Sequence, residues 1–183
     1  MKRKYEAFDP QSEILGQTLF ALFLCAHHDI LRPSAKKHGL VNIEPEQWYP
    51  LSALMAVFND LANGKTANVD FVSFGLTVAE VTPTAVERGT VPFEEALLRF
   101  ATTSYQMVHR GEVGEQIVEK VGERHLKIIS RTPYPDDFWI GLYYGIARQS
   151  LPPGSQLSLQ FDETIPRQDE GGDVTVIHVT WNH

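Results

Sequence analysis

The sequence predicts an α+β fold in which a helical N-terminal half packs on a four-stranded antiparallel sheet with a crossing helix. Two observations lead to this prediction. In residues 1–110, apolar side chains recur mainly every three or four positions, as on a buried helix face. In residues 111–183, strand-like runs with a period of two lie on either side of one further helical segment. With 183 residues the chain is long enough for one sizeable core, so residues 1–183 are expected to form a single domain.

The first helical segment begins after Ser12 and is expected to run to about Leu31, where Pro33 follows. A short helix after that proline is expected to end at Gly39, because glycine after basic residues is a common helix stop. Residues 41–50 are expected to cross the molecule in an extended conformation. Two aromatic side chains anchor this crossing, Trp48 and Tyr49.

Three further helices complete the helical half. Their apolar stripes predict helices at residues 51–61, from residue 70 onward, and at residues 93–109. Pro92 introduces the last of them, since proline suits the first turn of a helix, and Gly111 follows its end. The N-terminal 110 residues are therefore expected to be mainly helical.

The C-terminal part alternates between strands and one helix. Strands are expected at about 114–121, 124–131, 156–163 and 173–181, and a helix at 136–149 lies between the second and the third. Prolines on both sides of that helix support its limits. The last two strands are expected to turn one apolar face toward the helices, formed by Leu157, Leu159, Phe161, Ile177, Val179 and Trp181.

Charge and composition exclude several classes of protein. A formal net charge of −7, with only 16 lysine and arginine residues, argues against a basic face for nucleic acid. The longest apolar run, around residues 18–26, has about half of the roughly 20 residues that a membrane-spanning helix needs, so no membrane span is expected. Cys25 is the only cysteine, which excludes an intramolecular disulfide and suits a reducing compartment. A cytoplasmic location is therefore expected.

Motifs for catalysis and metal binding are incomplete. Cys25, His27 and His28, together with His38, offer metal-ligating atoms. The adjacent helix residues His27 and His28, however, point about 100° apart and do not easily share one metal. Residues 64–66 look like the end of a phosphate-binding loop, but Asn59 stands where its first glycine is required. No serine lies in a complete nucleophile elbow. The sequence therefore favours a protein that is not an enzyme and binds no metal.

Aromatic residues concentrate on two of the expected helices. Phe100 and Tyr105 lie on the helix before the first strand, and Trp139 and Tyr143 lie on the helix that crosses the sheet. Such residues belong either to the core or to the wall of an apolar pocket, where a few polar tips orient a ligand. These four are the candidate ligand-binding residues. The crossing helix also carries two glycines that let another backbone or a flat ligand approach closely, Gly141 and Gly145.

The order of elements and three stretches of sequence resemble a known superfamily. Residues 126–130 run into the glycine-dotted stretch 138–147 as that superfamily's strand runs into its helix, and residues 172–181 look like its last strand. The superfamily contains the haem-based nitric oxide and oxygen sensors (H-NOX), the 4-vinyl reductase-like ligand-binding domains and the TRAPP trafficking subunits. The resemblance covers roughly residues 71–181. It implies a pocket-bearing fold and, for a bacterial-type member, a cytoplasmic sensor or regulatory domain.

The residues that hold haem in an H-NOX sensor are mostly replaced. The resemblance places Ser130 at the serine of the Tyr-x-Ser-x-Arg set that holds the haem propionates. The tyrosine place is then Ile128 and the arginine place is Thr132, so the guanidinium that pairs with carboxylates is missing. The remaining candidates for the axial ligand are His109, at the far end of its helix, and His125. The resemblance therefore implies the fold without a haem cofactor.

The sequence thus favours a non-enzymatic sensory or regulatory domain that binds a small apolar molecule through the aromatic residues of the two helices. Two alternatives stay open. One is a haem-based gas sensor with His109 or His125 as its axial ligand. The other is a protein–protein interaction module without a ligand, as resemblance to TRAPP subunits allows. A homodimer or a separate signalling partner fits each of these functions.

Overall fold

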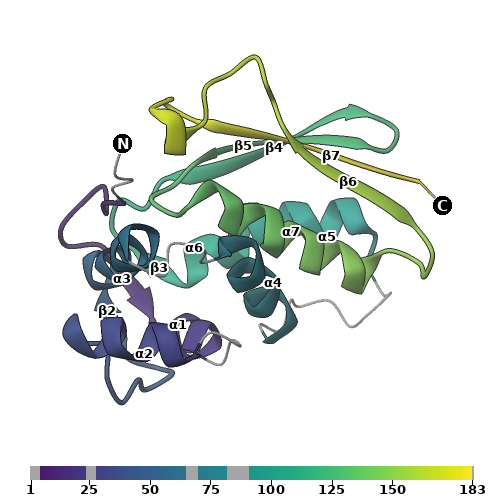
Figure 1. Cartoon of the computed structure of the whole chain (residues 1–183). Helices are drawn as coiled ribbons and strands as arrows, with labels where there is room; N and C mark the ends of the chain where they lie inside the picture. The colour runs from purple at the N-terminus through teal and green to yellow at the C-terminus, as the bar shows by residue number, and fades with distance from the viewer. Residues whose placement is uncertain (1–4, 24–27, 65–69, 82–90, 183) are drawn as a thin grey trace.

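The fold is α+β, as the sequence predicts, with helices gathered on one face of a four-stranded sheet (Figure 1). The computed structural model describes residues 5–23, 28–64, 70–81 and 91–182 of the chain. The helical elements are α1 (Gly16–Phe23), α2 (His28–Lys37), α3 (Leu51–Asn63), α4 (Phe71–Val81), α5 (Phe93–Arg99), the π-helical turn η1 (Phe100–Ser104), α6 (Tyr105–Met107), α7 (Asp136–Ser150) and the 3-10 turn η2 (Gln168–Glu170).

The main sheet is antiparallel and has the strand order β4-β5-β7-β6. Its strands lie within a few residues of the predicted limits, at β4 (Glu115–Gly122), β5 (His125–Arg131), β6 (Gln156–Phe161) and β7 (Thr175–Asn182). The register also confirms the predicted apolar face, because Leu157 pairs with Trp181 and Leu159 pairs with Val179. This face packs on the helices, and α7 crosses it (Figure 1).

A second, small sheet lies in the helical half and is not predicted by the sequence. It has the order β2-β1-β3 and consists of β1 (Glu13–Leu15), β2 (Trp48–Pro50) and β3 (His109–Arg110). The prediction of one helix from Ser12 to Leu31 is therefore wrong at its start, since Ile14 pairs with Tyr49 and with His109. These partners lie far away in the sequence, and local periodicity carries no information about them. Of the predicted extended crossing at residues 41–50, only Trp48–Pro50 forms a strand, β2, and a turn precedes it at residues 45 and 46.

The prediction that a helix ends before Pro33 is wrong, because Pro33 lies inside α2, which runs from His28 to Lys37. A proline in a helix interior removes one backbone hydrogen bond. Leu31 and Ala35 are buried on either side of it, and this packing offsets the lost bond. The predicted end of the helix is confirmed, since α2 stops at Lys37 and Gly39 adopts a left-handed φ of +78°.

The backbones of α4 and α7 touch at glycine positions. A Cβ on Gly141 would lie 1.8 Å from the carbonyl oxygen of Val72, and a Cβ on Gly75 would lie 1.9 Å from the carbonyl oxygen of Phe138. Both distances are far below van der Waals contact, so only glycine fits at these positions. The glycine face of α7, which includes Gly145, is therefore covered by α4 and leaves no room for a flat ligand there.

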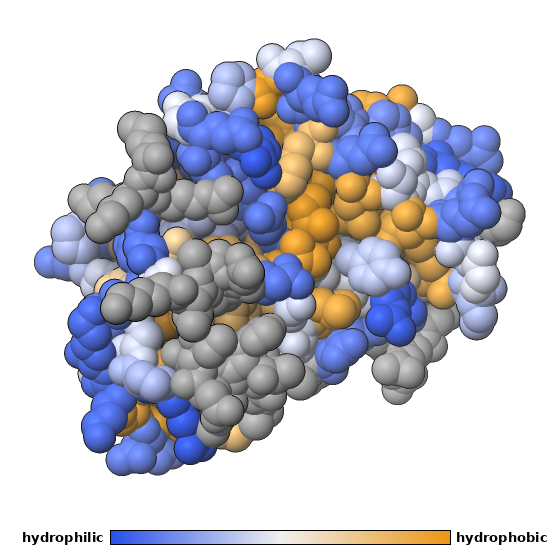
Figure 2. Space-filling model, viewed as in Figure 1, coloured by the Kyte–Doolittle hydropathy of each residue, from blue (hydrophilic) through white to orange (hydrophobic). Residues whose placement is uncertain are grey.

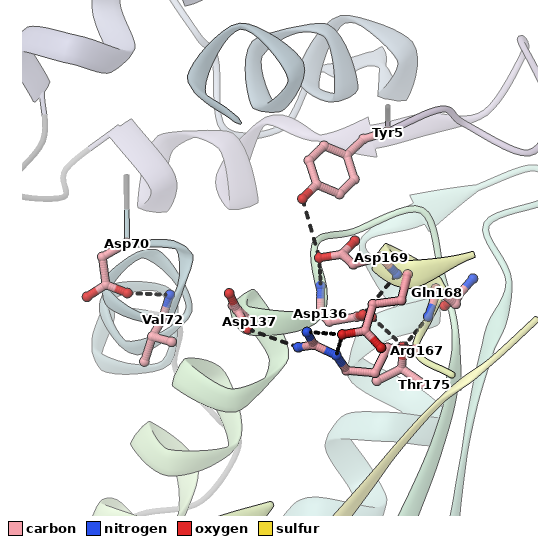
Figure 3. Close-up of polar contacts among 10 residues, drawn as sticks. Tyr5, Asp70, Val72, Asp136, Asp137, Arg167, Gln168, Asp169 and Thr175 are labelled. Atoms are coloured by element: carbon pink, nitrogen blue, oxygen red, sulfur yellow. Dashed lines mark hydrogen bonds and ion pairs between the residues drawn. The ribbon is translucent and has the colours of Figure 1, made fainter. Parts of the chain in front are cut away.

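Polar contacts fasten the start of α7 to β7 and to η2 (Figure 3). The buried carboxylate of Asp136 accepts hydrogen bonds from the Thr175 hydroxyl and, at 3.0 Å, from the backbone N–H of Asp169. The backbone N–H of Asp136 donates in turn to the carboxylate of Asp169 at 3.3 Å, and the Tyr5 hydroxyl reaches the same carboxylate at 3.4 Å. Segments from both ends of the chain thus meet where α7 begins.

Candidate ligand site at the aromatic cluster

The four aromatic residues predicted to bind a ligand come together in one group, which we call the aromatic cluster: Phe100, Tyr105, Trp139 and Tyr143. The rings of Trp139 and Tyr143 stack with their centroids 5.9 Å apart. Phe100 presents its edge to both of these rings at 6.4 Å, and Tyr105 contacts Trp139 at 5.7 Å. The structure therefore brings the predicted residues together, while their role in binding stays a prediction.

The local helix geometry explains why these side chains meet. Trp139 and Tyr143 are four residues apart on α7 and so lie on the same face, one turn above the other. Phe100 and Tyr105 are five residues apart, a spacing that an α-helix would turn toward different faces. The π-helical turn η1 removes this mismatch, because the backbone N–H of Tyr105 bonds to the carbonyl of Phe100 and the wider turn realigns the two residues.

The aromatic cluster lies in the interior, with one side chain at its edge. The exposed fractions of Tyr105, Trp139 and Tyr143 are 2%, 2% and 0%. Phe100 is only partly buried and packs against this core from its rim. Phe100 is therefore the member of the cluster that can move without breaking the buried packing of the others.

The polar tips of the cluster are bonded with one exception. The indole N–H of Trp139 donates to the Thr132 hydroxyl at 2.9 Å, and the Tyr105 hydroxyl donates to the carbonyl of Val113 at 2.6 Å. The hydroxyl of Tyr143 has no hydrogen-bond partner among the described residues. Burial raises the pKa of Tyr143 well above its ordinary value, so this hydroxyl is a neutral donor.

The sheet adds a second unpaired polar group beside the cluster. Gln116 of β4 is 4% exposed, and neither atom of its side-chain amide has a partner within the described residues. It pairs across the sheet with Ser130, whose hydroxyl lies 3.4 Å from that of Thr132. Sequence analysis missed Gln116. The available signal was its phase, because strand alternation places it on the same inward face as Val118.

His109 is buried next to the cluster, and both of its ring nitrogens are used. Nδ1 lies 2.7 Å from the carbonyl oxygen of Tyr105, which can only accept, so Nδ1 carries the proton. Nε2 then accepts a hydrogen bond from the hydroxyl of Tyr134 at 2.5 Å. Burial lowers the pKa of His109 to about 4, so the ring is neutral at physiological pH. Tyr134, between two prolines, is a further residue of the site region that sequence analysis missed.

The residues present do not fit a haem. Because Nδ1 of His109 bonds to the Tyr105 carbonyl, Nε2 is the nitrogen that would have to bind iron. Nε2 already accepts a hydrogen bond from the Tyr134 hydroxyl. Ile128 and Thr132 occupy the tyrosine and arginine places of the set that holds the haem propionates. Ile128 is buried in the core and Thr132 accepts a hydrogen bond from the Trp139 indole, so neither offers a cation to a propionate.

The second histidine candidate lies away from the aromatic cluster. His125 alternates along β5 with the inward-facing Leu126 and so belongs to the opposite face of the sheet. Its Nε2 lies 2.8 Å from Nδ1 of His178, whose own Nε2 lies 3.2 Å from the carboxylate of Asp162. Strand alternation therefore turns the ring of His125 away from the face of the sheet on which the helices pack.

Neither a metal cluster nor a membrane span is found in the part of the chain that the structure describes. No three His, Cys, Asp or Glu side chains within it are placed to hold a metal ion. Of the metal ligands considered from the sequence, Cys25 and His27 lie outside the described residues. Within the same described ranges, no helix is both long enough and apolar enough to cross a bilayer.

A shallow groove lies on the surface at the end of α7. It has a volume of about 370 Å³ and is lined by Tyr144, Ala147, Arg148, Leu151, Pro152, Pro153, Gly154, Ser155 and Leu157. Apolar side chains also gather in the middle and right of the face drawn in Figure 2, over the region where Figure 1 places α7 and β6. This surface is separate from the aromatic cluster, whose side chains point into the core.

Solved structures of H-NOX domains share this fold. An H-NOX protein from S. oneidensis in the Fe(II)NO ligation state superposes with a TM-score of 0.70 at 12% identity, covering 93% of this chain and 100% of that one. An oxygen-binding H-NOX domain related to soluble guanylate cyclases gives 0.64 at 17% identity, covering 92% and 93%. No family model and no curated protein matches the sequence. At such low identity the likeness establishes the fold alone: the chain has the fold of an H-NOX domain.

Proposed function

We propose that this protein is a non-enzymatic sensory or regulatory domain whose small apolar ligand contacts the aromatic cluster. One observation carries the proposal. Side chains from two helical segments, predicted from the sequence to be pocket walls, meet in one cluster. The cluster contains a buried hydroxyl that has no partner among the described residues. Ligand sites of this kind combine aromatic walls with a few polar groups that orient the ligand.

The shared fold supports a ligand at this place. The similar solved proteins bind oxygen or nitric oxide at an H-NOX domain. In this chain, Ile128 and Thr132, at two of the propionate-binding places, are uncharged, and His109 is bonded to Tyr134. Both features favour an uncharged organic ligand over haem. A cytoplasmic protein that signals to a partner, or as a homodimer, is consistent with such a role.

Native mass spectrometry of gently purified protein tests the proposal. We expect a species heavier than the chain by the mass of one small molecule, which is released on denaturation. Phe100→Ala should reduce its occupancy at least tenfold, because Phe100 closes the edge of the cluster. Phe20→Ala, which removes a phenylalanine that is 48% exposed on α1, is the matched control and should leave the occupancy unchanged. Wild-type protein with no bound mass, or equal occupancy in both variants, contradicts the proposal.

An absorption spectrum of the same sample distinguishes a haem-based gas sensor from a domain that binds an uncharged organic ligand. We expect no Soret band, because burying two propionates without a guanidinium partner costs several kcal/mol. A band at one haem per chain that His109→Ala abolishes would favour a gas sensor instead. The second alternative is a protein–protein interaction module, and the surface groove lined by Tyr144 and Arg148 favours it. Wild-type protein that carries no small molecule but binds a partner protein at this groove would support that alternative.

A further inference from the structure

The interior beside η1 contains two buried polar groups that have no hydrogen-bond partner among the residues that the structure describes. They are the hydroxyl of Tyr143 and the side-chain amide of Gln116, which have exposed fractions of 0% and 4%. A buried polar group without a partner costs about 1–3 kcal/mol, and native proteins keep few of them. Two such groups within the described ranges therefore indicate a further bonding partner, such as a bound small molecule.

Contacts lead from both groups to the same buried residues. Tyr143 stacks on Trp139 at 5.9 Å, and the Trp139 indole bonds to Thr132, which lies 3.4 Å from Ser130, the cross-strand neighbour of Gln116. The Tyr105 hydroxyl, which interacts electrostatically with Tyr143, bonds to the carbonyl of Val113, three residues before Gln116. β4 and α7 also approach the same turn, since η1 packs on β4 while its Phe100 ring contacts Tyr143.

The turn η1 is an independent sign of a site. π-Helical turns are less stable than α-helix, and they occur frequently at functional sites. Here the turn places Phe100, the only partly buried member of the aromatic cluster, over the ring of Tyr143. Rotation of Phe100 outward would uncover the ring of Tyr143 without disturbing the bonded tips of Tyr105 and Trp139.

We infer that Tyr143 and Gln116 bind a neutral, flat molecule that carries a carbonyl oxygen beside an N–H group, as amides and lactams do. This inference rests on the proposed function and adds the chemistry of the ligand to it. The Gln116 amide offers both a donor and an acceptor, and the Tyr143 hydroxyl offers a further donor to the ligand carbonyl. The ligand is uncharged because no charged side chain of the described residues is bonded to either group, and an unpaired buried charge is costly. A flat shape suits a ligand that lies beside aromatic rings, here those of Phe100, Trp139 and Tyr143.

Calorimetric titration with two ring compounds of similar shape tests the inference. Isoquinolone has the carbonyl and the N–H group, whereas isoquinoline has neither. Wild-type protein should bind isoquinolone at least tenfold more tightly than isoquinoline, since each hydrogen bond to an otherwise unpaired group is worth about 1 kcal/mol or more. Tyr143→Phe and Gln116→Leu should each abolish most of that preference. Equal binding of both compounds by the wild type overturns the inference.

Matched control variants change the same residue types where they are exposed. Tyr144→Phe alters the next residue of α7, which is 41% exposed, and Gln160→Leu alters an exposed position of β6. Both should keep the wild-type preference for isoquinolone. If Phe100→Ala weakens both compounds while Tyr143→Phe changes nothing, the proposed pocket stands and the assignment of its hydrogen-bonding groups fails. If no variant changes binding, both fail.

The stability of ligand-free protein gives a second readout. Removing a buried group that has no partner removes its desolvation cost, so Tyr143→Phe and Gln116→Leu should each raise the melting temperature by about 2–4 °C. A fall in the melting temperature of both variants would mean that buried water already satisfies these groups. That result overturns the inference, because no unpaired group would then be left for a ligand.

Discussion

His109 is fixed by two hydrogen bonds that determine where its proton lies. The carbonyl of Tyr105 accepts from Nδ1, and the hydroxyl of Tyr134 donates to Nε2, so the neutral tautomer satisfies both contacts. Burial lowers the pKa of His109 to about 4, and the bond to the Tyr105 carbonyl opposes this shift only in part. The ring therefore serves as a structural connection between the end of the helical half and the segment before α7.

We expect the His109 ring to remain unprotonated from pH 7 to pH 5, as followed by the Cε1–H signal in NMR spectra. The folded-state pKa of about 4 lies below the ordinary value of 6.5, so the unfolded chain binds this proton first. The corresponding stability is complete above about pH 6.5 and is lost as the pH falls toward 4, by roughly 3 kcal/mol in all. A midpoint near that of free histidine in the same buffer would contradict this prediction.

Helices α4 and α7 pack backbone to backbone because the residues at their contact are glycines, which carry no side chain. Gly75 and Gly141 let the two backbones approach to distances at which no Cβ fits. This contact fixes the position of α7, whose Trp139 and Tyr143 side chains contact Phe100 of η1. At the scale of elements, the glycines therefore position the aromatic cluster without touching it.

Gly141→Ala should lower the free energy of unfolding by about 3 kcal/mol or more, because its Cβ would overlap the backbone of Val72. Urea denaturation followed by circular dichroism measures the change. Gly122→Ala is the control, since its Cβ would lie 3.3 Å from the Cβ of His125 and needs only a small shift. Its effect should stay below about 1 kcal/mol. A loss at Gly141 as small as that of the control would show that α4 and α7 are not packed backbone to backbone.

At the scale of the whole molecule, hydrogen bonds at the start of α7 join segments that are distant in the chain (Figure 3). Asp136 bonds to Thr175 in β7 and to Asp169 in η2, and Asp169 in turn receives the hydroxyl of Tyr5. Desolvation raises the pKa of the Asp136 carboxyl, although the bonds from Thr175 and Asp169 oppose this shift. This network fixes the start of α7 relative to both termini.

Asp136→Ala should lower the free energy of unfolding by about 2 kcal/mol or more, because it leaves the Thr175 hydroxyl and the Asp169 N–H without their acceptor. Asp137→Ala, one residue along, removes only a partly exposed ion pair with Arg167 at 3.6 Å and should cost less than about 1 kcal/mol. Chemical denaturation of both variants measures the difference. Equal losses would mean that the buried contacts of Asp136 add nothing to stability.

Local sequence pattern predicts the elements whose partners are near in the chain. The strands before and after Gly122 pair as a hairpin, and their alternation indicated their limits. The four residues of the aromatic cluster were likewise found from helical spacing and composition. The short strand at Ile14 was missed because its partners, Tyr49 and His109, are set by tertiary contacts that local spacing does not encode.

The sequence by itself determined the α+β class, the four strands of the main sheet and the aromatic character of the region between α7 and η1, because hydrophobic periodicity and turn residues are local properties. Only the tertiary structure decided which polar groups in that region are paired. Tyr134 reaches His109, and Thr132 reaches Trp139, while Tyr143 and Gln116 reach nothing within the described residues. Hydrogen bonding between side chains depends on distances of a few tenths of an ångström between distant segments, which no spacing along the chain specifies.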